Sequence, residues 1–172
     1  AMTMEDSTVR NSLASVDSAI ETERISPKLA RVTVEFVLTS PFWRLSTAIA
    51  DNTTTINTNP KAMVVSNPGT IEERDATIIL TGPLSNTVIT NSTNGCTLTY
   101  TGTIASPRVV TISTSNGQYV ATNDLGTNVI GSLSHSGSPA LMVFETGDNT
   151  LSIADDTHTT GTVKVSFNAP YL

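Results

Sequence analysis

Few side chains in this sequence are of the types that carry out catalysis. Its 172 residues include two histidines, His135 and His158, and 15 aspartates and glutamates. A hydrolase needs a nucleophile with a base within reach, or two opposed carboxylates. We find no set of these residues whose spacing suggests either arrangement, and Gly-rich phosphate loops and Cys-x-x-Cys pairs do not occur. We therefore expect a protein that is not an enzyme and needs no cofactor.

A metal site near the end of the chain is the first alternative, because His158 closely follows Asp155 and Asp156. Two carboxylates and an imidazole nitrogen suit several divalent ions. The other interpretation is a solvated turn before the last strand, and we favour it. His135 lies in residues 132–138, a stretch of serines and glycine that we expect to be a flexible polar loop.

A calcium site is the second alternative, because Glu145, Asp148 and Asn149 could offer side-chain oxygens. These residues lack the regular acidic spacing of a known calcium loop, and a tight strand connection already explains Gly147. The charge run at residues 72–75 is similarly explained as a solvated entry to a strand. We expect no bound metal.

Carbohydrate binding would draw on aromatic side chains, which stack on sugar rings, with polar side chains for the hydroxyl groups. Aromatic residues make up only 5% of the chain. Phe144 and Phe167 fall within apolar runs and are expected in the core, which leaves Tyr100 and Tyr119 as the exposed candidates. A carbohydrate-binding module is therefore the alternative function.

Composition excludes several classes of partner. The formal charge is −6, with only nine lysines and arginines, so the chain does not suit nucleic acid or an anionic membrane surface. No apolar stretch approaches the roughly 20 residues of a membrane span, and the first residues lack the features of a signal peptide. The single cysteine, Cys96, suits assembly in a reducing cytoplasm and is expected to be a buried strand residue.

One helix is expected, close to the start of the chain. Val9, Leu13, Val16 and Ile20 recur at helical spacing, and Asp6 or Ser7 could cap the helix. Residues 31–38 then alternate as a half-buried strand does, with the following side chains on its apolar face: Val32, Val34, Phe36 and Leu38.

The rest of the chain predicts short strands separated by turns. Asn94-Gly95 and Asn116-Gly117 are expected to form type I′ hairpin turns, because Asn-Gly adopts positive φ at least cost. Gly147-Asp148-Asn149 is expected to serve a third tight connection. The nine expected strands are residues 62–66, 77–81, 87–90, 97–100, 109–113, 119–121, 141–144, 151–154 and 162–167.

These elements predict an all-β fold. No helix of useful length is expected after residue 50, so the sheets must be mainly antiparallel. We predict a two-sheet jelly-roll or galectin-like sandwich, with a short N-terminal segment of one helix and one strand. Charged residues concentrate in residues 1–75, and a boundary near 46–52 divides the chain into domains at 1–45 and 46–172.

Four segments carry a resemblance to a known family. Residues 34–44, VEFVLTSPFWR, resemble the strand and Pro-x-Trp signature that closes the ring-forming belt region of siphophage distal tail proteins. Residues 147–153 and 163–172 are similar to the Gly-x-Asn turn, strand and final Tyr-Leu with which that family's galectin-like sandwich often ends. Asn67-Pro-Gly69 resembles a polar loop near the first strands of that sandwich.

The resemblance implies a structural role at the tip of a phage tail, with residues 1–45 as the C-terminal part of the belt and 46–172 as the sandwich. The implied partners are the tail tube, the tail-associated hub and the receptor-binding protein, in a virion assembled in the cytoplasm of a bacterial host. In this setting the alternative function is a carbohydrate-binding module that helps the virion adsorb to the host cell wall. The family forms homo-hexamers. Here the belt looks truncated, so we expect a monomer or weak oligomer. Pro41, Phe42 and Trp43 are expected to anchor one domain on the other.

Overall fold

The chain folds almost entirely into β-strands. The computed structural model describes residues 2–3, 9–12, 14–16, 20–38, 42–49, 52–115, 117–138, 141–157 and 160–172. Over these ranges it contains eighteen strands and one 3-10 turn, η1 (Ile130–Ser132). The chain divides into two compact units, Ala1–Ser46 with Tyr171–Leu172, and Thr47–Pro170. The helical segments in the described ranges include none long and apolar enough for a membrane span.

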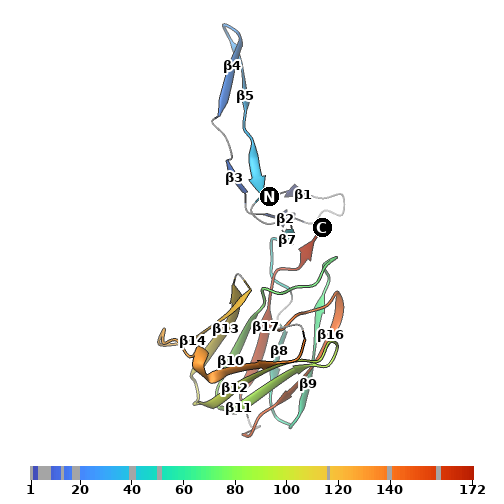
Figure 1. The fold of residues 1–172 in the computed structure, drawn as a ribbon, viewed down its shortest axis with the longest axis vertical. Helices are drawn as coiled ribbons and strands as arrows, with labels where there is room; N and C mark the ends of the chain where they lie inside the picture. Colours follow the sequence, from blue (N-terminus) through green and yellow to red (C-terminus); the bar gives the residue numbers. More distant parts are fainter. Residues whose placement is uncertain are drawn as a thin grey trace. The chain divides into compact units, whose positions relative to one another are not determined.

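The unit Thr47–Pro170 consists of two five-stranded sheets that face each other (Figure 1). The first sheet has the order β14 (Gln118–Asn123), β13 (Val109–Ser115), β10 (Thr77–Thr81), β17 (Thr162–Ser166), β8 (Asn52–Thr55). The second has the order β15 (Leu133–Ser136), β12 (Cys96–Ile104), β11 (Leu84–Asn91), β16 (Gly147–Ala154), β9 (Lys61–Asn67). Neighbouring strands pair antiparallel throughout both sheets, which confirms the predicted class.

The core lies between these sheets and follows from the alternation along each strand. In β10, Ile78 and Leu80 point inward, while Thr77, Ile79 and Thr81, which alternate with them, are half-buried, as a period of two requires. The rings of Phe144 and Phe167 pack with centroids 5.3 Å apart, and Cys96 is buried in β12 as predicted. The largest buried apolar side chains are Ile56, Val65, Leu80, Leu84, Ile89, Leu98, Ile112, Met142, Phe144, Leu151 and Ile153.

Two predictions within this unit are wrong, and one strand was not expected. Residues 132–138 were expected to form a flexible loop, but they contain β15, which pairs with β12 through Leu98 and His135. Residues 141–144 were expected to form a strand, but only Phe144 forms an isolated bridge, to Glu73. No strand was expected at residues 52–55, but they form β8, which pairs with β17. For β8 and β15 a remote partner strand decides the structure, and local composition does not indicate that partner.

The hairpin turns agree with the sequence in part. Residues 116–117 join β13 to β14, with Ser115 paired to Gln118 and Gly117 at φ 73°, while Asn116 lies outside the described residues. The β11–β12 turn is longer than predicted, because Asn91 pairs with Cys96 and only Gly95 adopts positive φ. It is therefore a four-residue connection and not a type I′ turn.

The other unit is made of short pairings. A four-stranded sheet has the order β1 (Met2–Thr3), β2 (Val9–Asn11), β7 (Trp43–Leu45), β18 (Pro170–Tyr171). Two ribbons accompany it: β3 (Ala14–Val16) with β6 (Phe36–Leu38), and β4 (Glu21–Ser26) with β5 (Leu29–Thr33) (Figure 1). Every residue of β4 and β5 is exposed.

Two predictions for this unit are also wrong. The expected helix at residues 9–20 is replaced by β2 and β3, although Leu13 and the expected caps Asp6 and Ser7 lie outside the described residues. Valines disfavour helix slightly, and pairing to β7 and β6 outweighs their helical spacing. The expected strand at residues 31–38 is split between β5 and β6, and its apolar face is exposed, with Val32 at 58% and Phe36 at 62%.

Candidate functional site

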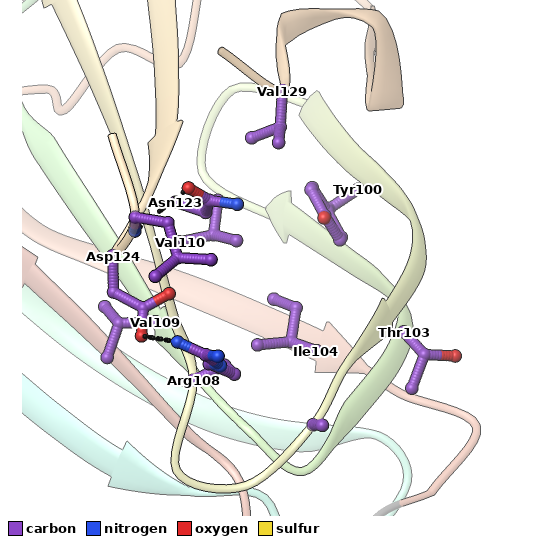
Figure 2. A pocket seen from close by; sticks show the side chains of 11 residues that line it. Tyr100, Thr103, Ile104, Arg108, Val109, Val110, Asn123, Asp124 and Val129 are labelled. Atoms are coloured by element: carbon purple, nitrogen blue, oxygen red, sulfur yellow. Dashed lines mark hydrogen bonds and ion pairs between the residues drawn. The ribbon is translucent and has the colours of Figure 1, made fainter. Parts of the chain in front are cut away.

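A pocket of about 210 Å³ opens between β12 of one sheet and β13 and β14 of the other (Figure 2). Turns at residues 105–108 and 124–129 border it. Its polar members are Tyr100, Thr103, Arg108, Asn123 and Asp124, and its apolar members include Ile104, Val110 and Val129. A concave, largely apolar site with a few convergent polar groups is the usual form of a small-molecule site.

An ion pair forms the polar wall of the pocket. Arg108 Nη1 lies 3.1 Å from Asp124 Oδ2, and both side chains are partly exposed (Figure 2). The backbone on each side of the pair is fixed. Gly82 N–H donates to Arg108 O at 2.9 Å, and Asp124 N–H donates to Val109 O at 2.9 Å. The backbone of both residues is therefore held by the turns and does not depend on the ion pair for its position.

Gly82 allows the Arg108 turn to lie close to the sheet. A Cβ on Gly82 would stand 2.2 Å from Ile104 O and 2.5 Å from Ala105 O. These are backbone atoms, which cannot rotate away. Any larger residue would push the 105–108 turn outward, so the glycine helps to set the position of Arg108 in the pocket wall.

Asn123 directs an amide nitrogen into the pocket. Its side-chain oxygen accepts hydrogen bonds from Leu125 N–H at 3.1 Å and Thr127 N–H at 2.9 Å. These two donors fix which end of the amide is oxygen, so the NH₂ group must face the other way. Figure 2 shows it pointing toward Tyr100. The described part of the chain offers this NH₂ group no acceptor.

Tyr100 forms the aromatic wall of the pocket, and it corrects a prediction. It was expected to be an exposed residue on which a sugar could stack, but only 8% of it is exposed because β12 turns it into the core. Its phenolic hydroxyl has no hydrogen-bond partner within the described ranges, and Tyr100 lines the pocket. Tyr100 can therefore offer an edge and a hydroxyl group, but not an open ring face.

These groups give the pocket two kinds of donor, one carboxylate acceptor and an apolar lining. Searches of protein families, curated proteins and solved structures found no match to this chain. Because the pocket places hydrogen-bond donors and an acceptor side by side, it suits a ligand that both donates and accepts hydrogen bonds.

Tyr119, the other predicted sugar-stacking residue, is occupied elsewhere. It lies in β14 and is half-buried against the core, and its hydroxyl accepts a hydrogen bond from Met142 N–H at 2.6 Å. Burial raises the pKa of Tyr119 to about 12. Its ring is 6.0 Å from that of His135 in β15. Tyr119 therefore helps to close one edge of the two sheets, and the prediction that it is exposed is wrong.

His135 is buried at the atom that would carry a proton. Its Nε2 has no hydrogen-bond partner within the residues that the structure describes, and burial lowers the pKa of the imidazole. His135 belongs to no metal site among the described residues, because they contain no cluster of three or more histidines, cysteines or acids that could hold a metal ion.

Asp155, one of the predicted metal ligands, fastens a turn. It is 1% exposed, so the expectation of a solvated turn is wrong at this residue. Its Oδ2 accepts from Ser85 N–H at 2.8 Å and Thr87 Oγ1 at 2.9 Å, and its Oδ1 accepts from Thr157 N–H at 2.9 Å. Asp156 accepts a bond from Asn86 Nδ2, while His158 lies outside the described residues. Both carboxylate oxygens of Asp155 therefore already have donors.

The residues of the predicted calcium site have different surroundings and different hydrogen-bond partners. Asn149 is fully buried, and its Oδ1 accepts from Glu145 N–H at 2.9 Å and Asn91 Nδ2 at 3.1 Å. Asp148 is exposed. Gly147, with φ 85°, begins β16 and pairs with Asn67, so the segment is not the tight hairpin that was expected.

The charge run at residues 72–75 is only partly solvated. Glu72 and Arg74 are joined by a hydrogen-bonded ion pair at the surface. Glu73 is fully buried, exchanges two backbone hydrogen bonds with Phe144, and accepts a bond from Asp75 N–H. The prediction of a solvated strand entry is therefore wrong for Glu73.

Sequence reasoning missed Arg108, Asn123 and Asp124. The signal that could have found them is the Asn-Asp-Leu-Gly turn at residues 123–126, combined with one of the two basic residues after residue 76. Phe42 and Trp43 are half-buried, with Trp43 in β7, and Pro41 lies outside the described residues. Their role as an anchor between domains stays a prediction.

Proposed function

We propose that the chain is a non-enzymatic structural component of a siphophage tail tip, an adaptor between the tail tube and the host-recognition apparatus. The motif order described above supports the family, and the antiparallel two-sheet unit agrees with a galectin-like or jelly-roll sandwich. Its implied partners are the tail tube protein, the hub and the receptor-binding protein. The observation that carries the adaptor role is the exposed apolar surface of the other unit.

Apolar side chains gather on the ribbons of that unit without a core of their own. Two-stranded ribbons are marginally stable in water, and exposed apolar patches mark interaction sites. We name this surface the arm, residues 20–37. Its exposed large apolar side chains are Ile20, Ile25, Leu29, Val32, Phe36 and Val37.

The charges of the arm fit binding by shape and apolar contact. Residues 20–37 carry three basic and three acidic side chains, whereas the whole chain has a net charge of −6. Glu23 and Arg31 form an exposed ion pair at 3.7 Å across the ribbon. A neutral surface contributes little electrostatic steering, so affinity for a partner would come from burial of the apolar side chains.

The test is binding to the tail tube and hub proteins of the phage that encodes this chain. The double variant Val32→Lys/Phe36→Lys places charges on the arm and should abolish co-elution with those proteins in size-exclusion chromatography. The matched control is Val64→Lys/Val120→Lys, which changes two exposed valines of the two-sheet unit. Co-elution that survives the arm variant, or that fails for the unmodified chain with both proteins, would contradict the proposal.

A further inference from the structure

We propose that the pocket of Figure 2 binds one neutral, hydroxyl-rich ring, such as a single pyranose residue, through Tyr100, Arg108, Asn123 and Asp124. This goes beyond the adaptor role, which rests on the arm. It also replaces the predicted stacking on Tyr100 and Tyr119 with hydrogen bonding in a pocket that contains Tyr100 alone. Four properties of the pocket support the inference: its size, its hydrogen-bonding groups, the charge of its wall and the fixed backbone of its turns.

The size of the pocket limits the ligand. Its volume is about 210 Å³. Sites for drug-sized molecules are about 300–1,000 Å³, so this pocket is suited to a smaller occupant. One six-membered sugar ring is the right scale, and a second ring of a longer glycan would have to lie outside.

The polar groups match neighbouring hydroxyls. Each hydroxyl donates one hydrogen bond and accepts others. The Asn123 NH₂ group and the Arg108 guanidinium donate, the Asp124 carboxylate accepts, and the Tyr100 hydroxyl can do both. The Asn123 NH₂ group and the Tyr100 hydroxyl have no partner among the described residues, so a ligand could use them without breaking a protein hydrogen bond.

The charge of the wall favours a neutral ligand. Arg108 and Asp124 neutralise each other at 3.1 Å. An anion drawn to Arg108 would meet the Asp124 carboxylate, and a cation drawn to Asp124 would meet the guanidinium. Hydroxyl groups avoid both conflicts because they can accept from one residue and donate to the other.

The apolar lining and the fixed turns complete the argument. Ile104, Val110 and Val129 can contact the C–H faces of a sugar ring, which are apolar. The backbone bonds that hold Arg108 and Asp124 are present without a ligand. Little ordering of these turns is then needed on binding, which is what preorganisation contributes to affinity.

The experiment is an NMR titration of the isotope-labelled chain. The probes are glucose, galactose, mannose, rhamnose and N-acetylglucosamine, with inorganic phosphate as the anionic comparison. At least one sugar should shift the amide resonances of Arg108, Asn123 and Asp124, with a dissociation constant on the order of 1 mM for so small a ligand. Its disaccharide should bind no more than about two-fold tighter, because the second ring lies outside.

Two tyrosine variants separate the pocket from general effects. Tyr100→Phe removes a hydroxyl without a protein partner, so it should weaken sugar binding about five-fold and leave the melting temperature unchanged. Tyr119→Phe removes the acceptor of Met142 N–H, so it should lower the melting temperature and leave sugar binding unchanged. Asp124→Asn, at the partly exposed rim, provides a second weakening variant that does not alter the core.

Shifts centred on the pocket, weakened in the Tyr100→Phe and Asp124→Asn variants and kept in the Tyr119→Phe variant, support the proposal. It is overturned if no sugar shifts these resonances at about 50 mM, far above the expected dissociation constant. Shifts centred elsewhere, or equal shifts with phosphate, overturn it as well. None of these outcomes bears on the arm, which is tested with tail proteins.

Discussion

Asn91 donates a hydrogen bond from its side-chain amide to the side-chain oxygen of Asn149 at 3.1 Å, and both residues are fully buried. Asn91 also donates to Val143 O at 2.8 Å, and Asn67 donates to Phe144 O at 3.1 Å. These amides fasten residues 141–146, which join neither sheet as a regular strand. Side chains here perform the role that a backbone ladder performs elsewhere in the unit.

Replacing Asn149 by alanine should destabilise the two-sheet unit strongly. Asn149 Nδ2 donates to Glu145 O at 2.8 Å, and its Oδ1 accepts from Glu145 N–H and Asn91. The alanine variant removes these bonds at a fully buried position, which should lower the free energy of unfolding by about 3 kcal/mol. Urea denaturation measures the change. Asn57→Ala, at an exposed residue, is the control and should change stability by less than about 0.5 kcal/mol; equal losses in both variants would contradict the buried network.

Adding one methyl group at Gly82 should be costly. Its Cβ would overlap Ile104 O, so Gly82→Ala should lower the free energy of unfolding by roughly 1–3 kcal/mol and displace the turn that carries Arg108. Gly131 provides the matched control, because a Cβ there meets no atom within 4 Å. Thermal unfolding of the two variants should differ clearly, and similar melting temperatures would show that the 105–108 turn is free to move.

The imidazole of His135 should make stability fall in mild acid. Its pKa in the folded chain lies below the ordinary value of 6.5 because the ring is buried. As the pH falls below that value the unfolded chain takes up a proton that the folded chain refuses, so stability present above pH 6.5 is progressively lost. The denaturant concentration at the unfolding midpoint should be lower below pH 6.5 than above it in the wild type. The difference should be smaller in His135→Gln. An identical acid response in the variant would assign the effect to other groups.

Tyr119 should have the opposite influence at high pH. Burial raises its pKa from 10.0 to about 12, so the folded chain holds the phenolic proton longer than the unfolded chain does. Stability is therefore complete below pH 10 and declines as the pH rises toward 12. Phenolate absorbance should show one late-titrating tyrosine that disappears in Tyr119→Phe. Retention of the late step in that variant would show that another tyrosine produces it.

Much of the strand content could be predicted from local alternation, because strands such as β10 bury every second residue. The errors arose where pairing overrides composition. β15 is polar except for Leu133, yet it is a strand because β12 pairs with it. Residues 141–144 are apolar enough for a strand, yet asparagine side chains hold Val143 and Phe144 in place instead. Sequence periodicity carries no information about either partner.

The pocket was less predictable than the fold. Tyr100 was expected to be exposed, but its exposure depends on which face of β12 meets the core. Arg108 lies on a turn and Asn123 at the end of β14, and only the pairing of β13 with β14, which places Val110 opposite Asn123, brings them together. Single residues that are far apart in the sequence form no recognisable spacing. The pocket therefore could not be predicted without the register of the paired strands.

The pairing of β8 with β17 has a consequence for synthesis on the ribosome. Thr53 lies beside Lys164, so strands from opposite ends of the unit are neighbours, and β17 also separates β8 from β10. While β17 is still inside the ribosome, β8 and β10 each expose a strand edge whose backbone N–H and C=O groups have no partner strand. Such non-local closure is slow, and the unfinished chain stays vulnerable to misassociation until β17 has left the ribosome.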